Sequence, residues 1–226
     1  MKYKEIKKAS FISRPNRFVA LVSIDGRETA VHVKNTGRCR ELLSPGAEVW
    51  LEKSSNPDRK YRYSLVTVKK GERMVNMDSQ APNKAVGEWL SEGGLFSDVK
   101  LIRPECRYGN SRFDFYVEYG DRKAFIEVKG VTLENDGAVS FPDAPTERGS
   151  KHLRELSSCV KDGYEAYVIF VVQMKNVLYF TTNEAHDPVF ARTLTEARNE
   201  GVRILAYDCF VTEDEMKIGD KVEVKI

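Results

Sequence analysis

Two carboxylates and a lysine near the middle of the chain have the types and spacing needed for metal chemistry: Asp114, Glu127 and Lys129. Between the two acids, Gly120-Asp121 is a two-residue signal for a hairpin turn. If the residues that flank this turn pair with each other, Asp114 lies directly opposite Glu127, with Cβ atoms about 5 Å apart. Because side chains alternate along a strand, Lys129 then points to the same side as Glu127.

Facing carboxylates repel each other unless a cation lies between them. Mg²⁺, with Mn²⁺ as a substitute, takes oxygen ligands and keeps waters for a nucleophile or a substrate phosphate. Lys129 can hold an attacking water or neutralise charge that develops on a phosphate. The pattern therefore predicts a divalent-metal site, although a surface hairpin with an ordinary Glu–Lys pair remains the alternative. Alternation further predicts two faces, one with Asp114, Tyr116, Glu127 and Lys129, the other with Phe113, Phe115, Ile126 and Val128.

Two further clusters have side chains suited to nucleic acid. After the hairpin, Thr146, Arg148, Lys151 and His152 open a predicted helix, on which residues four apart share a face. They can contact a phosphate near the metal, or form an ordinary polar face. Near the start of the chain, Asn35 and Thr36 supply hydrogen bonds, Gly37 allows close approach and Arg38 supplies charge. The alternative for this second cluster is a turn with a helix cap.

The first 80 residues are predicted to form a small β-barrel. Apolar segments at 18–24, 29–33, 47–53 and 61–69 have the lengths of strands, and Asp25-Gly26 predicts a hairpin turn between the first two. A helical segment is expected over 36–43, capped by Thr36 and ended by Pro45-Gly46. Strands with one intervening helix suggest an OB-like barrel, with a simple β-meander as the alternative.

Residues 81–226 change to an αβββαβ pattern, so the whole chain is a mixed α+β or α/β protein of two domains, 1–80 and 81–226. Asn83 is expected to cap a helix over 84–90 that ends at Gly93-Gly94. The other expected elements are strands at 99–107, 112–119 and 123–131, a helix at 146–161, strands at 166–173 and 177–181, a helix between Asp187-Pro188 and Gly201, and a strand at 202–207.

Composition narrows the class of protein. The first 80 residues hold 17 Lys and Arg against 9 Asp and Glu, a balance that favours a polyanionic partner. The four cysteines are scattered without zinc spacing, which is typical of a reduced, cytoplasmic protein. The longest apolar run, 166–172, is too short to span a membrane, and no secretory signal or nucleotide-cofactor fingerprint is present. We therefore expect neither a membrane nor an organic cofactor as a partner.

The acid-hairpin-E-x-K arrangement resembles the PD-(D/E)xK nuclease superfamily. That resemblance implies that Asp114 and Glu127 bind Mg²⁺ together with the Val128 carbonyl, that Lys129 is the catalytic lysine, and that Glu88 is the upstream helical acid. The chain departs from the superfamily at Phe113, where many members have proline.

In combination, the segments at 32–38, 75–83 and 113–130 resemble the sugar fermentation stimulation protein family. This resemblance covers nearly the whole chain and implies an N-terminal OB-like domain, a restriction-endonuclease-like domain and DNA binding, in which Asn35 and Arg38 are candidate contacts.

Three functions follow from these observations. The leading hypothesis is a Mg²⁺-dependent nuclease that acts on DNA, with RNA as a further possible substrate. The second is a DNA-binding regulatory protein of sugar metabolism that keeps the nuclease fold without catalysis. The third, suggested by the family's name alone, is an enzyme acting on a small phosphorylated metabolite.

Overall fold

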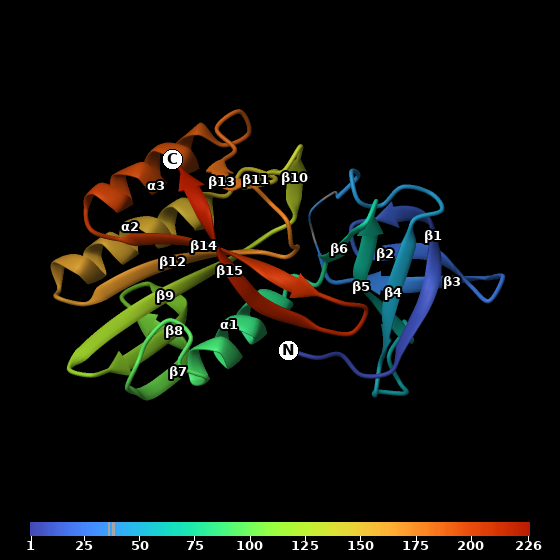
Figure 1. The fold of residues 1–226 in the computed structure, drawn as a ribbon, viewed down its shortest axis with the longest axis horizontal. Helices are drawn as coiled ribbons and strands as arrows, with labels where there is room; N and C mark the ends of the chain where they lie inside the picture. Colours follow the sequence, from blue (N-terminus) through green and yellow to red (C-terminus); the bar gives the residue numbers. More distant parts are fainter. Residues whose placement is uncertain (36, 38) are drawn as a thin grey trace.

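The first domain of the computed structural model is a closed β-barrel (Figure 1). The structure describes residues 1–35, 37 and 39–226. Five strands close the barrel in the order β1-β2-β3-β5-β4, because β3 pairs with β5 as well as with β2, and β6 is added beside β5. The strands are β1 (Ile6–Asn16), β2 (Val19–Ile24), β3 (Arg27–Val33), β4 (Glu48–Lys53), β5 (Tyr63–Lys70) and β6 (Arg73–Asn76).

Alternating apolar residues fill the barrel, as the sequence predicts. Ala20 and Val22 of β2 and Val31 and Val33 of β3 are almost completely buried. The turn at Asp25-Gly26 has positive φ at both residues, 50° and 80°, as a tight hairpin of this type requires. The four expected strands are present, and β1 and β6 are additional strands that we did not predict.

The helix expected over 36–43 is wrong for the part of that segment that the structure describes. Residues 40–42 form a turn, and the backbone N–H groups of Leu42 and Leu43 both donate to the carbonyl of Cys39. Cys39 has φ of 47°, a left-handed conformation that cannot continue an α-helix. The expected cap, Thr36, lies outside the described residues.

The second domain is a nine-stranded mixed sheet with helices on both faces (Figure 1). The sheet order is β10-β11-β13-β15-β14-β12-β9-β8-β7. The helices are α1 (Ala81–Ser91), α2 (Glu147–Lys161) and α3 (Pro188–Asn199). The strands are β7 (Val99–Tyr108), β8 (Ser111–Tyr119), β9 (Arg122–Val131), β10 (Leu133–Asn135), β11 (Ala138–Phe141), β12 (Glu165–Val172), β13 (Tyr179–Thr182), β14 (Arg203–Val211) and β15 (Met216–Lys225).

Two apolar cores lie on opposite faces of this sheet. Helix α1 contributes Ala85, Val86 and Leu90 to a cluster with Ile126 and Ile169. Helix α2 contributes Leu153 and Leu156, and α3 contributes Phe190, to a second cluster that holds Phe125 and Phe170. Neighbouring residues of β9 and β12 therefore point alternately to α1 and to α2, which fixes the side on which each polar residue of β9 can act.

Most expected elements of the second domain are present, but the start of α1 differs and three strands are additional. Helix α1 begins at Ala81, with Pro82 in its first turn, so Asn83 lies inside the helix and is not its cap. The short strands β10 and β11 and the C-terminal strand β15 were not predicted.

The described part of the chain contains no helix that is both long and apolar enough to cross a membrane.

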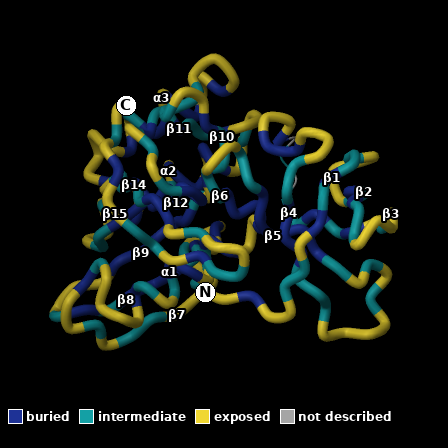
Figure 2. The backbone as a smooth tube through the Cα atoms, turned by 45° about the vertical axis from the view of Figure 1, so that its right-hand side comes forward, coloured by how far each residue is buried: buried dark blue, intermediate teal, exposed yellow. Residues whose placement is uncertain are grey.

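The amino-terminal residues pack against the second domain before the chain enters the barrel. Met1 and Tyr3 belong to the α1-side apolar cluster, and Lys2 forms a β-bridge with Glu215. Figure 2 shows the amino terminus near α1, followed by a segment that runs across to the barrel, and Met1 exchanges backbone hydrogen bonds with Met216 of β15. The two domains are thus joined by this segment as well as by the linker between β6 and α1.

Candidate active site

The hairpin register predicted from Gly120-Asp121 is confirmed. Strands β8 and β9 pair from Tyr119↔Arg122 to Phe115↔Ile126, as a two-residue turn requires. The ladder ends at Phe115, the residue after Asp114, so Asp114 and Glu127 are not a paired position of it. Asp114 Oδ2 instead accepts a hydrogen bond of 2.7 Å from the backbone N–H of Val128.

This break in the ladder changes one predicted face. Phe113 was expected on the side opposite Tyr116, but both rings pack against Phe125, at centroid distances of 5.5 Å and 5.2 Å. The strict alternation of β8 therefore fails at Asp114. The reason is that the Asp114 carboxylate, and not a neighbouring strand's backbone, satisfies the amide of Val128.

Asp114 is held by groups from two elements. Besides the Val128 amide, Asn83 of α1 donates from Nδ2 to Asp114 Oδ1 at 2.6 Å. Burial raises the pKa of Asp114, and the negative charge of Glu127 raises it further, while the two hydrogen bonds and the charge of Lys129 act in the opposite direction. A raised pKa marks a carboxylate whose negative charge is not fully compensated by its protein neighbours.

Glu127 lies almost completely inside the domain, with 4% of the residue exposed. Its Oε1 accepts from Lys129 Nζ at 2.5 Å and lies 2.7 Å from His152 Nδ1 of α2. Burial alone would raise the pKa of Glu127, but the hydrogen bond from His152 and the charge and hydrogen bond of Lys129 outweigh burial and hold the pKa below its ordinary value. Glu127 is therefore an ionised carboxylate inside the protein.

The second oxygen of Glu127 is an orphan. Oε2 is buried and has no hydrogen-bond partner in the structure. A buried anionic oxygen without a partner is costly, and a bound cation removes that cost. No group of three His, Cys, Asp or Glu side chains suited to a metal occurs among the described residues. The donors present are two carboxylates, a set that suits Mg²⁺, which keeps several waters.

The structure does not bring Glu88 to this cluster. Glu88 Oε2 forms a salt bridge of 2.6 Å with the amino group of Met1, and 56% of its side chain is exposed. The α1 residue that contacts the acids is Asn83. The sequence predicts Asn83 as the helix cap, whereas in the structure Asn83 lies inside α1 and contacts Asp114. Val128 meets Asp114 through its N–H, and the role of its carbonyl as a metal ligand stays a prediction.

The predicted phosphate contacts on α2 separate into two kinds. His152 is buried, 5% exposed, and contacts Glu127, so it belongs to the carboxylate cluster. Arg148 and Lys151 line an open hollow of about 570 Å³ beside His152, together with Arg112. Thr146 caps α2 by accepting from the Gly149 N–H at 3.0 Å. Two basic side chains thus remain near the surface, next to the buried acids.

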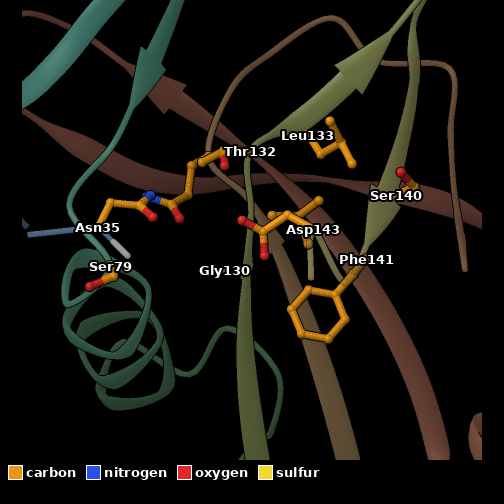
Figure 3. Close-up of a pocket in the computed structure, with 10 residues that line it drawn as sticks. Asn35, Ser79, Gly130, Thr132, Leu133, Ser140, Phe141 and Asp143 are labelled. Atoms are coloured by element: carbon orange, nitrogen blue, oxygen red, sulfur yellow. The ribbon is translucent and has the colours of Figure 1, made fainter. Parts of the chain in front are cut away.

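The first-domain cluster lies beside the carboxyl end of β9. Asn35 Oδ1 accepts from the Gly37 N–H at 2.8 Å, and Arg14 donates to the carbonyls of both residues. Asn35 lines a cavity whose floor is Gly130, the residue after Lys129 (Figure 3). The other two predicted contacts, Thr36 and Arg38, lie outside the described residues.

Comparison with known proteins gives two domain matches and several similar chains. Residues 12–77 match the family description "SfsA N-terminal OB domain", and residues 80–215 match "Sugar fermentation stimulation protein RE domain". A sugar fermentation stimulation protein homolog of Clostridium beijerinckii is 60% identical over 224 residues, 99% of each chain. A homolog from Desulfitobacterium hafniense strain DSM 10664 / DCB-2 is 57% identical over 226 residues, 100% of this chain and 99% of its own.

A solved structure is also similar over the whole length. The structure of Pyrococcus furiosus SfsA in complex with Ca²⁺ superimposes with a TM-score of 0.91 at 29% sequence identity, covering 100% of this chain and 98% of that one. The barrel and the mixed sheet therefore occur together, in the same order, in a related protein.

Proposed function

Because the chain belongs to the sugar fermentation stimulation protein family, we propose that it binds nucleic acid and hydrolyses phosphodiester bonds with the help of a divalent cation at Asp114 and Glu127. The OB-like barrel and the endonuclease-like sheet expected from the sequence are the architecture of this family. The proposal concerns what the acids at the end of β8 and β9 do.

One observation carries the proposal. Glu127 Oε2 is buried, anionic and without a hydrogen-bond partner. Glu127 is also close enough to Asp114 for its negative charge to raise the pKa of Asp114. Structural carboxylates are normally satisfied by hydrogen bonds, so an orphan beside a second acid is typical of a cation site. The similar Pyrococcus furiosus protein was solved with Ca²⁺, which takes oxygen ligands as Mg²⁺ does.

Each residue has a defined role in this proposal. Asp114 and Glu127 hold the cation, which supplies positive charge that polarises the phosphodiester when it is bound. Lys129, 17% exposed at its side chain, lies beside Glu127 and can orient an attacking water or neutralise charge on the phosphate. Asn83 and His152 hold the two carboxylates in position. Arg148 and Lys151 are placed to contact phosphates next to the site.

The test is a cleavage assay on end-labelled single- and double-stranded DNA and RNA, with Mg²⁺, with Mn²⁺ and with chelator. We expect metal-dependent cleavage by the wild-type protein. Lys129→Ala and Asp114→Asn are each expected to reduce the rate by roughly 10²-fold or more, because each removes a group that acts on the reacting phosphate or its cation. Lys123→Ala, which removes an exposed lysine at the other end of β9, is the matched control and is expected to cleave normally.

Two outcomes would contradict the proposal. Unchanged cleavage by Lys129→Ala and Asp114→Asn would show that another site does the chemistry. Tight, salt-dependent binding without turnover in any metal would instead support the regulatory function in DNA binding. Circular dichroism of each variant establishes that a lost activity is not a lost fold.

A further inference from the structure

A cavity opens between the two domains at the carboxyl end of β9. Its volume is about 110 Å³, and Gly130 forms its floor, one residue beyond Lys129. In Figure 3, Asn35 and Ser79 lie on one side of the cavity, Phe141 lies on the other, and the Asp143 carboxylate lies between them over Gly130. Pro82 packs against Gly130 and precedes Asn83, which donates to Asp114, so the cavity lies close to the Asp114 carboxylate.

Gly130 allows β9 to pack closely against Gln173 and Pro82. A Cβ atom at this position would lie 2.5 Å from Gln173 Oε1 and 2.9 Å from Pro82 Cγ, both closer than real contacts allow. Gln173 is buried and donates from Nε2 to the linker, which leaves its Oε1 toward Gly130. The wall of the cavity at Gly130 is therefore fixed by close packing of β9 against α1 and the linker.

The polar groups in the cavity suit a nucleobase and not a phosphate. Asp143 is an exposed anionic acceptor, so it repels phosphates and attracts N–H donors. Asn35 uses its Oδ1 for the Gly37 N–H, so its amide nitrogen keeps donors to offer. Phe141 is half-buried, with its ring against Phe190 at 5.1 Å, and adds an aromatic wall on which a base can stack.

A larger groove continues from the cavity and is lined by basic side chains of the first domain. It has a volume of about 680 Å³ and shares Thr132, Leu133 and Asp143 with the cavity. It is also lined by Arg17, Arg40 and Glu41 of the first domain. Two arginines in an open groove suit the phosphates of a strand whose base occupies the cavity.

We propose that this cavity is a subsite for an unpaired guanine in the nucleotide that flanks the phosphate attacked at Asp114 and Glu127. The proposal rests on the proposed nuclease function and adds a base preference to it. A carboxylate accepts two hydrogen bonds side by side, and guanine is the base that carries two adjacent N–H donors, at N1 and N2. Its O6 then faces the Asn35 amide. In a duplex this edge is engaged in pairing, so the substrate nucleotide is single-stranded or flipped out.

The experiment measures binding to three 21-nucleotide single strands by fluorescence anisotropy, with Ca²⁺ present. One strand is all thymine, one carries a central guanine, and one carries inosine, which lacks only the N2 amino group. All proteins carry Lys129→Ala, so that no cleavage intervenes. Asp143→Asn removes the charge but keeps the shape, and Asp121→Asn removes the same charge from the exposed β8–β9 turn as a control.

We expect the guanine strand to bind roughly fivefold or more tightly than the inosine strand, the lower end of what a well-placed pair of hydrogen bonds gives. In Asp143→Asn, the affinities for the guanine and inosine strands should differ by less than twofold. In Asp121→Asn, the ratio of these two affinities should be unchanged. Equal binding of all three strands by the parent protein would overturn the guanine subsite while leaving the nuclease proposal standing. If Asp143→Asn changed the affinity for all three strands equally, the guanine subsite would also be overturned, because the change would be a general electrostatic effect. Failure to bind any strand would count against nucleic-acid binding itself.

Discussion

Glu127 depends on two neighbours that lie on different elements. Lys129 comes from the same strand, two residues away, whereas His152 approaches from α2 and contacts the same carboxylate oxygen, Oε1. His152 is itself enclosed, with its ring edge-on to Phe113 at 5.9 Å and Arg148 Nε 3.4 Å from its Nε2. One oxygen of Glu127 is thus fixed by two side chains, and the other, Oε2, is buried without a hydrogen-bond partner among the described residues.

At this scale we predict that His152→Ala weakens cation binding without unfolding the protein. Partners that orient a metal-binding carboxylate are typically worth about 10- to 100-fold in metal affinity. The affinity for Mn²⁺ can be measured by isothermal titration calorimetry at pH 7. Arg154→Ala, on the exposed side of the same helix, is the control and should bind Mn²⁺ as the wild type does. Equal Mn²⁺ affinity in His152→Ala and Arg154→Ala would show that Glu127 needs no support from α2.

At the scale of elements, the linker between β6 and α1 is part of a buried polar network. Gln173, which follows β12, donates from Nε2 to the Asn76 carbonyl, to Asn76 Oδ1 and to the Asp78 carbonyl at 3.0–3.2 Å. Asp78 is completely buried and forms a salt bridge of 2.9 Å with Lys34, and Tyr3 contacts both linker residues. This network ties the linker, the barrel and the second sheet together directly behind Gly130.

We predict that Gln173→Leu destabilises the protein by about 1–3 kcal/mol, because it leaves buried linker carbonyls without donors. The free energy of unfolding can be measured by urea denaturation. Gln80→Leu is the matched control, because Gln80 is exposed and its side chain makes no cap hydrogen bond to α1. If the two variants were equally stable, the linker network would contribute nothing to the fold.

Strands whose pairing is set by a local turn could be predicted from the sequence, whereas weakly alternating strands could not. The register of β8 and β9 depends on a two-residue turn and on local alternation, so it was predicted correctly. Strands β1 and β15 were missed because each has only two buried residues, among them Phe11 and Val222, although each pairs with the strand next to it in the chain, β2 or β14. Such weak alternation is decided by tertiary contacts and cannot be recognised locally.

Helix phase explains why the wrong α1 residue was chosen for the site. Successive residues of an α-helix are turned by about 100°, and residues four apart share a face. Asn83 contacts Asp114 and Gly87 packs close to Phe115, so this face points to β8. Glu88, one residue further, is turned away and meets Met1 instead. The sequence shows that α1 carries an acid, Glu88, but it does not show which face of the helix points to β8. That orientation depends on the packing of the whole domain.

At the scale of the whole molecule, the cavity and the groove depend on how the barrel sits against the second sheet. A single cluster of buried residues runs from the barrel into the second domain. At its edge, Glu134 of β10 accepts from Lys70 Nζ at 2.7 Å and lies 2.9 Å from Arg73 Nη1, both on the barrel side. Leu133, the neighbouring residue, lines the proposed base cavity. This ion cluster therefore contributes to the alignment of the two domains at the site.

The ion cluster of Glu134, Lys70 and Arg73 makes the stability of the protein depend on pH. Burial alone would raise the pKa of Glu134, but the hydrogen bonds from Lys70, the Gly137 N–H and Arg73 and the charge of Lys70 lower it from 4.5 to about 2. A carboxyl whose pKa is depressed by folding stabilises the folded state above the unfolded value of about 4.5, and that contribution is lost as the pH falls toward 2. The shift corresponds to about 3 kcal/mol at neutral pH.

We therefore expect Glu134→Gln to be less stable than the wild type by up to about 3 kcal/mol at pH 7, and the difference to shrink steadily between pH 4.5 and pH 2. Urea denaturation at a series of pH values measures this difference. Glu72→Gln removes a glutamate that is 98% exposed and 3.6 Å from Lys69, so it should have little effect at any pH. A difference between Glu134→Gln and the wild type that does not change with pH would mean that the effect comes from packing, because only an ionised Glu134 attracts the two barrel cations across the domain boundary.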